Sequence, residues 1–380
     1  MNILYLGSPE SVHDLKWISY FSANAENHVF LLTEDLSLKN LSSDISSFLK
    51  ENNITLLGAI KPYSLLKPFS FIKSALKLRK ICKKNSIDIV HALNATPFAM
   101  WAYFTGKKYI ITTRGSDVLN VLPGLRNPEI RKFYLLILYL IFKKAFKNAT
   151  VITSTSCQQV AKIQEMFNLA KVEVVRTGVD VDSISREIDK TNLPLQLQNC
   201  DYINSPRWIG ALYNSKIQAQ AILMLDDSIH KKYTFVFYTN LRTQTNYLRE
   251  FEEILQTNEQ IKYIIFNKLP QQNALPCIKF AALNIMIPER DGTPNSALEA
   301  MASRCPLIVG NFAYDEDLFT ETCIRLHEHT PEALARMITE VLTNYPASLI
   351  ENAFNRVSEF GNRPIEMNKI NILYKKIINI

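Results

Sequence analysis

Two acidic residues bracket one short polar loop and could bind a polar ligand there. Asp291 and Glu299 have seven residues between them, and Pro294 suits a loop just before a helix that begins at Asn295 or Ser296. The run from Ser296 to Glu299 has the pattern of a capping box. A helix N-terminus presents unpaired N–H groups and its dipole favours negative charge, so this turn could hold an anion beside two carboxylates that accept hydrogen bonds from sugar hydroxyls. The alternative is an ordinary strand, loop and helix with solvated acidic residues.

Apolar runs on either side of this loop predict the strands that position it. Leu283–Ile287 enters the loop, and Pro306–Val309 follows the helix. Similar short runs alternate with helical patterns along the whole chain, which predicts two α/β units of parallel strands. A polar, irregular segment, Thr191–Asp201, is the predicted linker between them. The other predicted strands are Ile3–Leu6, His28–Thr33, Ile87–His91, Tyr109–Thr113, Val151–Ser154, Val172–Arg176, Asp201–Asn204, Thr234–Tyr238 and Lys262–Phe266.

Length and composition predict a globular protein of two domains that prefers anionic partners. The chain has 380 residues, 47% hydrophobic and 21% charged, with a net charge of +7. This charge suits nucleotides or acidic lipid surfaces, and no module for binding nucleic acid is recognised. The six cysteines show no metal-ligand spacing and indicate reduced thiols. No signal peptide and no apolar run of about 18 residues is found, so we expect a cytoplasmic protein.

Two basic segments of the first half are also rich in apolar residues. Lys61–Lys84 holds eight Lys or Arg and no acidic residue, interleaved with Leu, Phe and Ile. This pattern is typical of a helix that lies on an anionic membrane surface, and equally of a solvated helix face. The apolar run Phe133–Phe142 has basic residues at both ends. It is too short to span a bilayer and indicates a buried or interfacial helix.

Motifs along nearly the full length resemble those of the family 4 retaining glycosyltransferases. The resemblance implies the GT-B fold, in which two Rossmann-like α/β domains face each other across a cleft. We expect an acceptor-binding domain at 1–195, a nucleotide-sugar-binding domain at 196–362, and a helix at 363–380 that could return to the first domain. The similar segments, in order, are NILYLGSPESVHDLKW, IDIVHALNATP with ITTRGSDVL, ATVITSTSCQQVAK with VVRTGVDVDSI, INSPRWIGALYN and PERDGTPNSALEAMASRCPLIV.

The resemblance also implies roles for individual residues. Arg207 matches the arginine that binds the donor diphosphate, and Glu299 matches the acid that binds the donor ribose. Asp291 matches the acid near the donor sugar and the reacting face. His13 and Arg114 match positions that line the acceptor side of the cleft and approach the donor. The remaining residues expected to bind the donor are Lys216, Thr293, Pro294, Asn295, Ser296 and Ala297.

The chain departs from the family pattern at three of these positions. The first acid is usually glutamate, and Asp291 is one methylene shorter. The lysine that often follows the arginine is replaced by Leu212 and Tyr213, so Lys216 or Arg114 would have to substitute for it. Arg114 stands where many relatives have histidine. It could contact the donor phosphate or sugar, or pair with Asp117 as a structural residue.

Together these features predict a transferase that moves a sugar from a UDP- or GDP-sugar to a hydroxyl acceptor. The resemblance implies retention of anomeric configuration, no obligatory metal and no further cofactor, so the Asp-x-Asp of Asp180 and Asp182 is not read as a metal site. The basic segments favour a lipid-linked or membrane-surface acceptor, as in cell-surface polysaccharide or lipopolysaccharide assembly, with the protein peripheral at the inner face of the membrane. The alternative is a catalytically silent glycosyltransferase-like subunit that binds a partner or glycan.

Overall fold

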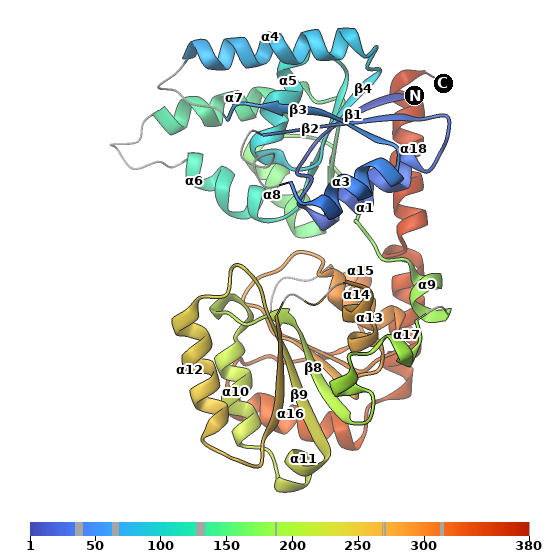
Figure 1. Cartoon of the computed structure of the whole chain (residues 1–380). Helices are drawn as coiled ribbons and strands as arrows, with labels where there is room; N and C mark the ends of the chain where they lie inside the picture. The colour runs from blue at the N-terminus through green and yellow to red at the C-terminus, as the bar shows by residue number, and fades with distance from the viewer. Residues whose placement is uncertain are drawn as a thin grey trace. The chain divides into compact units, whose positions relative to one another are not determined.

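The computed structural model divides the chain into two compact units (Figure 1). Unit 1 contains Met1–Thr177 and Glu366–Ile380, and unit 2 contains Gly178–Ile365. The structure describes residues 1–34, 41–62, 68–126, 134–186, 188–267, 269, 271–311 and 315–379. Parts of the predicted basic segments, including Phe133, and Phe312 after the acidic loop lie outside the described residues.

Unit 1 is built on a parallel sheet of seven strands in the order β3-β2-β1-β4-β5-β6-β7. Because parallel strands are covered by helices on both faces, they are continuously apolar rather than alternating. Tyr109–Thr113, for example, is buried at every position. The strands are β1 (Asn2–Leu6), β2 (His28–Glu34), β3 (Ile54–Ile60), β4 (Ile89–Ala92), β5 (Tyr109–Thr113), β6 (Val151–Ser154) and β7 (Glu173–Val174).

Helices connect successive strands and cover both faces of this sheet. One core contains Leu4, Trp101 and Phe146, and the other contains Ile3, Trp17 and Tyr374, which α18 contributes. The helices are α1 (Val12–Ser22), α3 (Ser43–Glu51), α4 (Pro68–Lys84), α5 (Met100–Phe104), α6 (Leu122–Arg126), α7 (Tyr134–Asn148), α8 (Cys157–Phe167) and α18 (Arg363–Ile378).

Unit 2 repeats the arrangement with six parallel strands in the order β10-β9-β8-β11-β12-β13. In both sheets the strand order reverses beside the first strand of the unit. The reversal lies between β1 and β4 in unit 1, and between β8 and β11 in unit 2. Ligands of such sheets bind beyond the carboxyl ends of the strands at this reversal. The strands are β8 (Asp201–Trp208), β9 (Tyr233–Thr239), β10 (Lys262–Asn267), β11 (Leu283–Met286), β12 (Leu307–Val309) and β13 (Ile324–Arg325).

The helices of unit 2 pack on both faces of the second sheet. One of the two main cores contains Phe235 and Phe251, and the other contains Met301 and Phe319. The helices are α9 (Val181–Arg186), α10 (Ser215–Leu223), α11 (Asp227–Lys232), α12 (Thr245–Gln256), α13 (Gln271–Lys279), α14 (Asn295–Ala302), α15 (Glu316–Phe319), α16 (Pro331–Thr343) and α17 (Ala347–Phe360).

The chain passes between the units at two places, and the first differs from the predicted linker. The crossing lies at Thr177 and Gly178, well before Thr191–Asp201. The polar segment is not a linker because Leu193 and Leu197 are buried against Tyr202 in a core of unit 2. The second crossing lies within α18, whose residues from Glu366 on belong to unit 1.

The structure also contains a strand that we did not predict. β3, Ile54–Ile60, pairs with β2 and has three of its seven residues buried, as expected at the edge of the sheet. Its glycine, Gly58, interrupts the apolar run and coincides with a shift in the pairing register between the two strands. None of the helices in the described part of the chain has the length and apolar character that a transmembrane span requires.

Candidate active site

Arg207 and Asp291 meet at the point where the strand order of the second sheet reverses. Arg207 is near the end of β8, and Asp291 follows the neighbouring strand β11. The Arg207 Nη2 atom lies 2.8 Å from Asp291 Oδ2, and both side chains are mostly buried, with 25% and 20% of their surface exposed. The ion pair thus joins the predicted diphosphate-binding residue to the predicted catalytic acid within one unit.

A cavity of about 400 Å³ opens beside this ion pair and is contained within unit 2. Arg207, Ser296 and Glu299 line it, and so do residues at the carboxyl ends of β8 and β9. Its volume falls in the range of ligand pockets for small molecules. The other lining residues are Pro206, Trp208, Tyr213, Tyr238, Thr239, Asn240, Leu269, Ala274 and Ile278.

Tyr213 is one of the two residues at which the resemblance implies a lysine, and it contacts Arg207. Its hydroxyl accepts a hydrogen bond of 2.8 Å from Arg207 Nη2, and the guanidinium carbon lies 4.6 Å from the centre of the tyrosine ring. Lys216 does not line the cavity. Its ammonium group pairs with Glu250 and lies 4.5 Å from the centre of the Tyr247 ring. The tyrosine therefore holds the arginine in place, while the lysine is engaged on the α10–α12 surface.

The environment of Arg207 keeps its side chain charged. Burial disfavours the charge and lowers the pKa of the guanidinium, but Asp291, Tyr213 and Glu299 together raise the pKa above its ordinary value. The Arg207 Nε atom is buried and has no hydrogen-bond acceptor among the described residues. An arginine held in this way has a donor left for an anionic ligand.

The helix after the acidic loop begins at Asn295, as predicted, but the capping box does not form. Pro294 is the N-cap and gives no side-chain hydrogen bond. Ser296 lies inside the first turn, where its hydroxyl donates to Met286 Sδ at 3.0 Å, so it cannot cap the helix. Hence the serine that we assigned to the cap stabilises the core, and Pro294 offers no side-chain acceptor to the first turn of α14.

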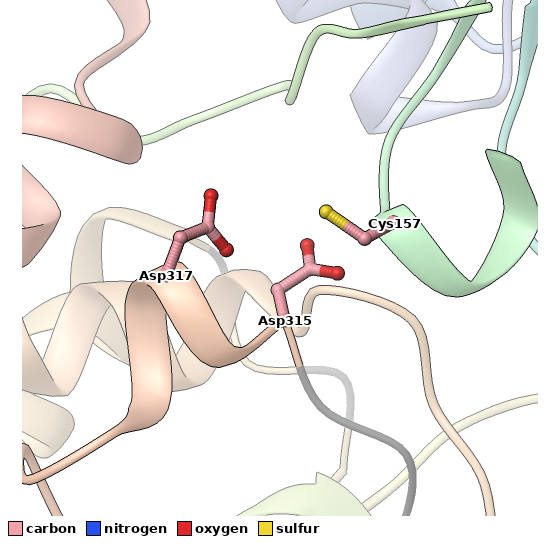
Figure 2. A group of neighbouring side chains, drawn as sticks. All are labelled: Cys157, Asp315 and Asp317. Carbon is pink, nitrogen blue, oxygen red and sulfur yellow. The ribbon is translucent and has the colours of Figure 1, made fainter.

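A buried carboxylate holds the loop before α14 in place. Thr293 Oγ1 donates a hydrogen bond of 2.7 Å to Asp315 Oδ2. Asp315 is the N-cap of α15 and is 1% exposed, and Figure 2 shows it with Asp317 at the start of that helix. Sequence reasoning missed Asp315, because no motif links it to a threonine so far away in the chain.

In unit 1, Arg114 pairs with Asp14 rather than with Asp117. Its Nη1 atom lies 2.9 Å from Asp14 Oδ1, and its guanidinium lies 5.6 Å from the centre of the Trp17 ring. Asp117 instead accepts backbone N–H groups, including those of Ala95 at 2.9 Å and Arg114 at 3.2 Å. The pairing of the Arg114 side chain with Asp117 that we considered is therefore wrong, because Asp14 is the partner. Burial raises the pKa of Asp14, against the lowering effect of Arg114.

His13 and His91 of unit 1 have different surroundings. His13 is an exposed residue in the first turn of α1. His91 is fully buried at the end of β4, where Nδ1 lies 2.5 Å from Tyr374 Oη and Nε2 lies 2.6 Å from Thr112 Oγ1. Burial, helped by Arg114, lowers the pKa of His91 to about 3. This histidine is a neutral structural residue that ties α18 to the sheet.

The two acids of the Asp-x-Asp sequence, Asp180 and Asp182, make contacts at helix α9. Asp180 Oδ1 accepts a 3.0 Å hydrogen bond from Ser183 N just before α9. Asp182 lies 3.5 Å from Arg186 one turn along the same helix. Both acids thus have the contacts of helix-terminal residues.

Comparisons with known proteins agree with this architecture. Residues 2–156 match the family model described as glycosyl transferase 4-like. No curated protein matches the chain significantly. A glycosyltransferase from Rickettsia africae is 16% identical, with a TM-score of 0.76 over 99% of this chain and 98% of that one. Anabaena HepE, solved with UDP-glucose, is 13% identical, with a TM-score of 0.72 over 99% of this chain and 100% of its own.

A third structure extends the likeness to another enzyme of the same fold. Sucrose-phosphate synthase from Thermosynechococcus elongatus is 14% identical, with a TM-score of 0.72 over 100% of this chain and 99% of that one. Two parallel α/β units with these structural neighbours show the GT-B fold, which confirms the predicted fold. The match to the glycosyl transferase 4-like model covers most of unit 1 and does not extend to unit 2.

Proposed function

We propose that this protein is a glycosyltransferase that moves a sugar from a nucleoside diphosphate sugar to a hydroxyl acceptor with retention of anomeric configuration. The single observation that carries the proposal is the cavity of about 400 Å³ with a charged arginine and a glutamate in its wall, at the strand reversal of the second sheet. HepE, a neighbour in fold, was solved with UDP and with UDP-glucose. A UDP- or GDP-sugar is therefore the proposed donor.

Different residues of unit 2 are proposed to bind the diphosphate and the ribose of the donor. When the bond between sugar and diphosphate breaks, negative charge develops on the leaving phosphate oxygens. Arg207 and the N-terminal turn of α14, from Asn295 to Ala297, would stabilise that charge because both are fixed before the reaction. Glu299, in the cavity wall, would accept hydrogen bonds from the ribose hydroxyls. Thr293 and Pro294 would hold the loop in position.

Asp291 has a second proposed role beside its ion pair with Arg207. Its Oδ2 atom holds the guanidinium, and its Oδ1 atom accepts a 2.9 Å hydrogen bond from the backbone of Gly292. Both contacts fix the carboxylate beside the cavity, where it could bind hydroxyls of the donor sugar. In a front-face reaction the departing phosphate oxygen takes the acceptor proton, so the protein needs no strong base. His13 and Arg114 of unit 1 are the proposed acceptor-side residues.

Release of nucleoside diphosphate from a panel of UDP- and GDP-sugars tests the proposed function. We expect one donor to be consumed, and Arg207→Ala to lower kcat/KM by about 100-fold or more, since a fixed charge that stabilises a transition state contributes several kcal/mol. Arg249→Ala, on the exposed part of α12, is the matched control and should keep wild-type turnover. Binding of a donor with no turnover of any sugar would favour a silent binding subunit instead.

We also propose that α4 binds the anionic, cytoplasmic face of a membrane, where a lipid-linked acceptor of cell-surface polysaccharide assembly would lie. Ile72 and Leu76 are 53% and 59% exposed on this helix. Lys73, Lys80 and Lys83 are exposed at helical spacing beside them. A stripe that combines exposed apolar side chains with exposed lysines suits an interface with anionic lipid.

Sedimentation with vesicles of phosphatidylglycerol and phosphatidylcholine tests this surface. Replacing Lys73, Lys80 and Lys83 together by serine should abolish most of the binding, since each lysine near an anionic surface contributes about 1 kcal/mol. Lys77 is left unchanged because its ammonium donates to Ala59 O at 2.9 Å. The control replaces Lys50, Lys375 and Lys376, three exposed lysines of α3 and α18. Equal binding by both triple variants would contradict the proposal.

A further inference from the structure

The two side chains that hold Arg207 come from two segments of unit 2 that are hydrogen-bonded to each other. Tyr213 ends a short helical turn before α10, and Asp291 lies in the loop after β11. The backbone N–H of Glu289, in that loop, donates to Leu212 O, in the turn, at 2.9 Å. The spacing between Tyr213 and Asp291, and hence the place of the guanidinium, therefore depends on contacts between the turn and the loop.

Asn214 supplies a second hydrogen bond between the turn and the loop, and it does so from its side chain. Its Nδ2 atom donates at 2.9 Å to the carbonyl oxygen of Ile287, a buried residue directly after β11. The same amide nitrogen lies 3.2 Å from Nδ1 of His329, whose Nε2 atom accepts from Asn311 N at 2.8 Å. Asn214 thus connects the turn of Tyr213 to the end of β11 and, through His329, to the end of β12.

The backbone of Asn214 is consistent with this use of its side chain. The residue is the N-cap of α10, where asparagine usually accepts a hydrogen bond from the first turn of the helix. Here it makes no such bond, since its backbone is left-handed, with a φ of +51°, and its amide turns to Ile287 instead. Asparagine is one of the few residues besides glycine that adopt this conformation readily. Position 214 therefore has a residue that fits the backbone and also carries the donor.

Gln218 holds the same turn from the side of α10. It is 2% exposed, and its Nε2 atom donates to Tyr213 O at 3.0 Å. The carbonyl of Tyr213 is thus bound to α10, while its neighbours Leu212 and Asn214 are bound to the segment after β11. These contacts fix the turn whose tyrosine hydroxyl accepts from Arg207 at 2.8 Å.

We propose that Asn214 is a positioning residue for Arg207. By joining the turn of Tyr213 to the loop of Asp291, it sets the spacing of the two groups that fix the guanidinium beside the cavity. A misplaced charge interacts less well with the charge that develops in a transition state. This inference rests on the proposed function, because it takes stabilisation of a leaving diphosphate as the task of Arg207.

Removal of the Asn214 amide tests the proposal in a backbone that tolerates the change. Asn214→Gly suits the left-handed φ and should lower kcat/KM for the donor by about tenfold, within the range for loss of one hydrogen bond. Asn214→Asp keeps the size of the side chain but places an acceptor against Ile287 O, so it should lose at least as much. A role limited to filling space predicts wild-type activity for Asn214→Asp. The matched control is Asn53→Gly, at an exposed asparagine of unit 1 with a φ of +53°, which should keep wild-type activity.

A double-mutant cycle with Arg207→Ala shows whether Asn214 acts through the arginine. If it does, Asn214→Gly should change kcat/KM by less than about twofold once Arg207 is replaced, because the effects of coupled residues are not additive. A merely structural role predicts the same fold loss in both backgrounds. The four proteins of the cycle are assayed for release of the nucleoside diphosphate from the donor, and circular dichroism reports whether each is folded.

The outcomes separate this inference from the proposed function. A tenfold loss in Asn214→Gly that disappears in the Arg207→Ala background supports the inference. Equal fold losses in both backgrounds, or wild-type activity in either Asn214 variant, overturn it and leave the proposed function intact. No turnover of any nucleotide sugar by the wild type overturns the proposed function, and this inference with it. If Asn214→Gly does not fold, Asn214→Asp takes its place in the cycle and the same outcomes decide.

Discussion

At the scale of single residues, Arg207 is held by two side chains, the carboxylate of Asp291 and the hydroxyl of Tyr213. Asp291 matches a family position, and its shorter side chain still reaches the guanidinium at 2.8 Å. Tyr213 is one of two residues at which the resemblance implies a lysine, and its hydroxyl accepts a hydrogen bond from the same arginine at 2.8 Å. Among the described residues that line the cavity, Arg207 is thus the one cation, and it is fixed by two contacts.

Removal of the Tyr213 hydroxyl tests how far the arginine depends on it. Tyr213→Phe leaves the ring beneath the guanidinium but loses a hydrogen bond to a charged group, so we expect KM for the donor to rise about tenfold. Tyr263→Phe is the matched control, because that hydroxyl accepts only a long bond of 3.3 Å from Gln256 on the surface. Steady-state kinetics of both variants provide the measurement, and an unchanged KM in Tyr213→Phe would show that Asp291 alone positions Arg207.

The burial of His91 predicts how the free energy of unfolding depends on pH. Its pKa is lowered from 6.5 to about 3 by burial, helped by Arg114, so the unfolded chain takes up the proton first as pH falls. Stability is therefore highest above pH 6.5 and falls between pH 6.5 and 3, by about 2 kcal/mol from pH 7 to 5 for this group. Urea unfolding at these two pH values should show a smaller loss for His91→Gln than for the wild type.

The control for this experiment is His28→Gln, which changes an exposed histidine at the start of β2. It should keep the wild-type difference in free energy of unfolding between pH 7 and 5. If His91→Gln keeps the same difference as well, His91 is not held neutral in the folded protein.

At the scale of elements, the sequence predicted those strands and helices whose ends are determined by residues close by in the chain. The strand–loop–helix around Asp291 is encoded by Pro294 and the apolar runs beside it, and β11, α14 and β12 lie where those signals indicate. The partner of Arg114 could not be predicted in this way. Asp14 lies a hundred residues earlier, and only the order of strands brings α1 beside the end of β5.

The linker shows the same limit. Its polar composition suggested a connection at Thr191–Asp201, but two leucines in it fill a core of unit 2. The real crossing at Gly178 is marked by a glycine with positive φ, and a single sequence cannot distinguish it from glycines of ordinary turns.

Two glycine substitutions test the close packing of the backbone around Gly178. Gly178→Ala combines a left-handed backbone with a contact of 2.7 Å to Gly361 O. We expect it to lower the free energy of unfolding by more than about 2 kcal/mol, because strain and overlap add. Gly106→Ala also has a positive φ, of +72°, but nothing within 4 Å of the new methyl group. It should cost about 1 kcal/mol. Chemical unfolding compares the two variants, and equal losses would show that position 178 tolerates a side chain.

At the scale of the whole molecule, each unit presents the carboxyl edge of a parallel sheet with a strand reversal in it. In unit 2 that edge carries Arg207, Asp291 and the start of α14, and in unit 1 it carries Arg114 and its partner Asp14. Fold class followed from the sequence because alternating apolar runs and helices leave few topologies. The donor base and the acceptor depend on the shape of loops, which such patterns do not encode.

Calorimetric titration of the wild type and of Glu299→Ala with UDP and GDP tests the central claim, that the cavity of unit 2 binds a nucleoside diphosphate. Glu253→Ala, on the exposed part of α12, is the control for loss of a carboxylate. We expect one nucleotide to bind the wild type and the control alike, and Glu299→Ala to bind it at least about tenfold more weakly, since hydrogen bonds to a charged group are lost. No binding by the wild type, or equal affinity in Glu299→Ala, would contradict the account.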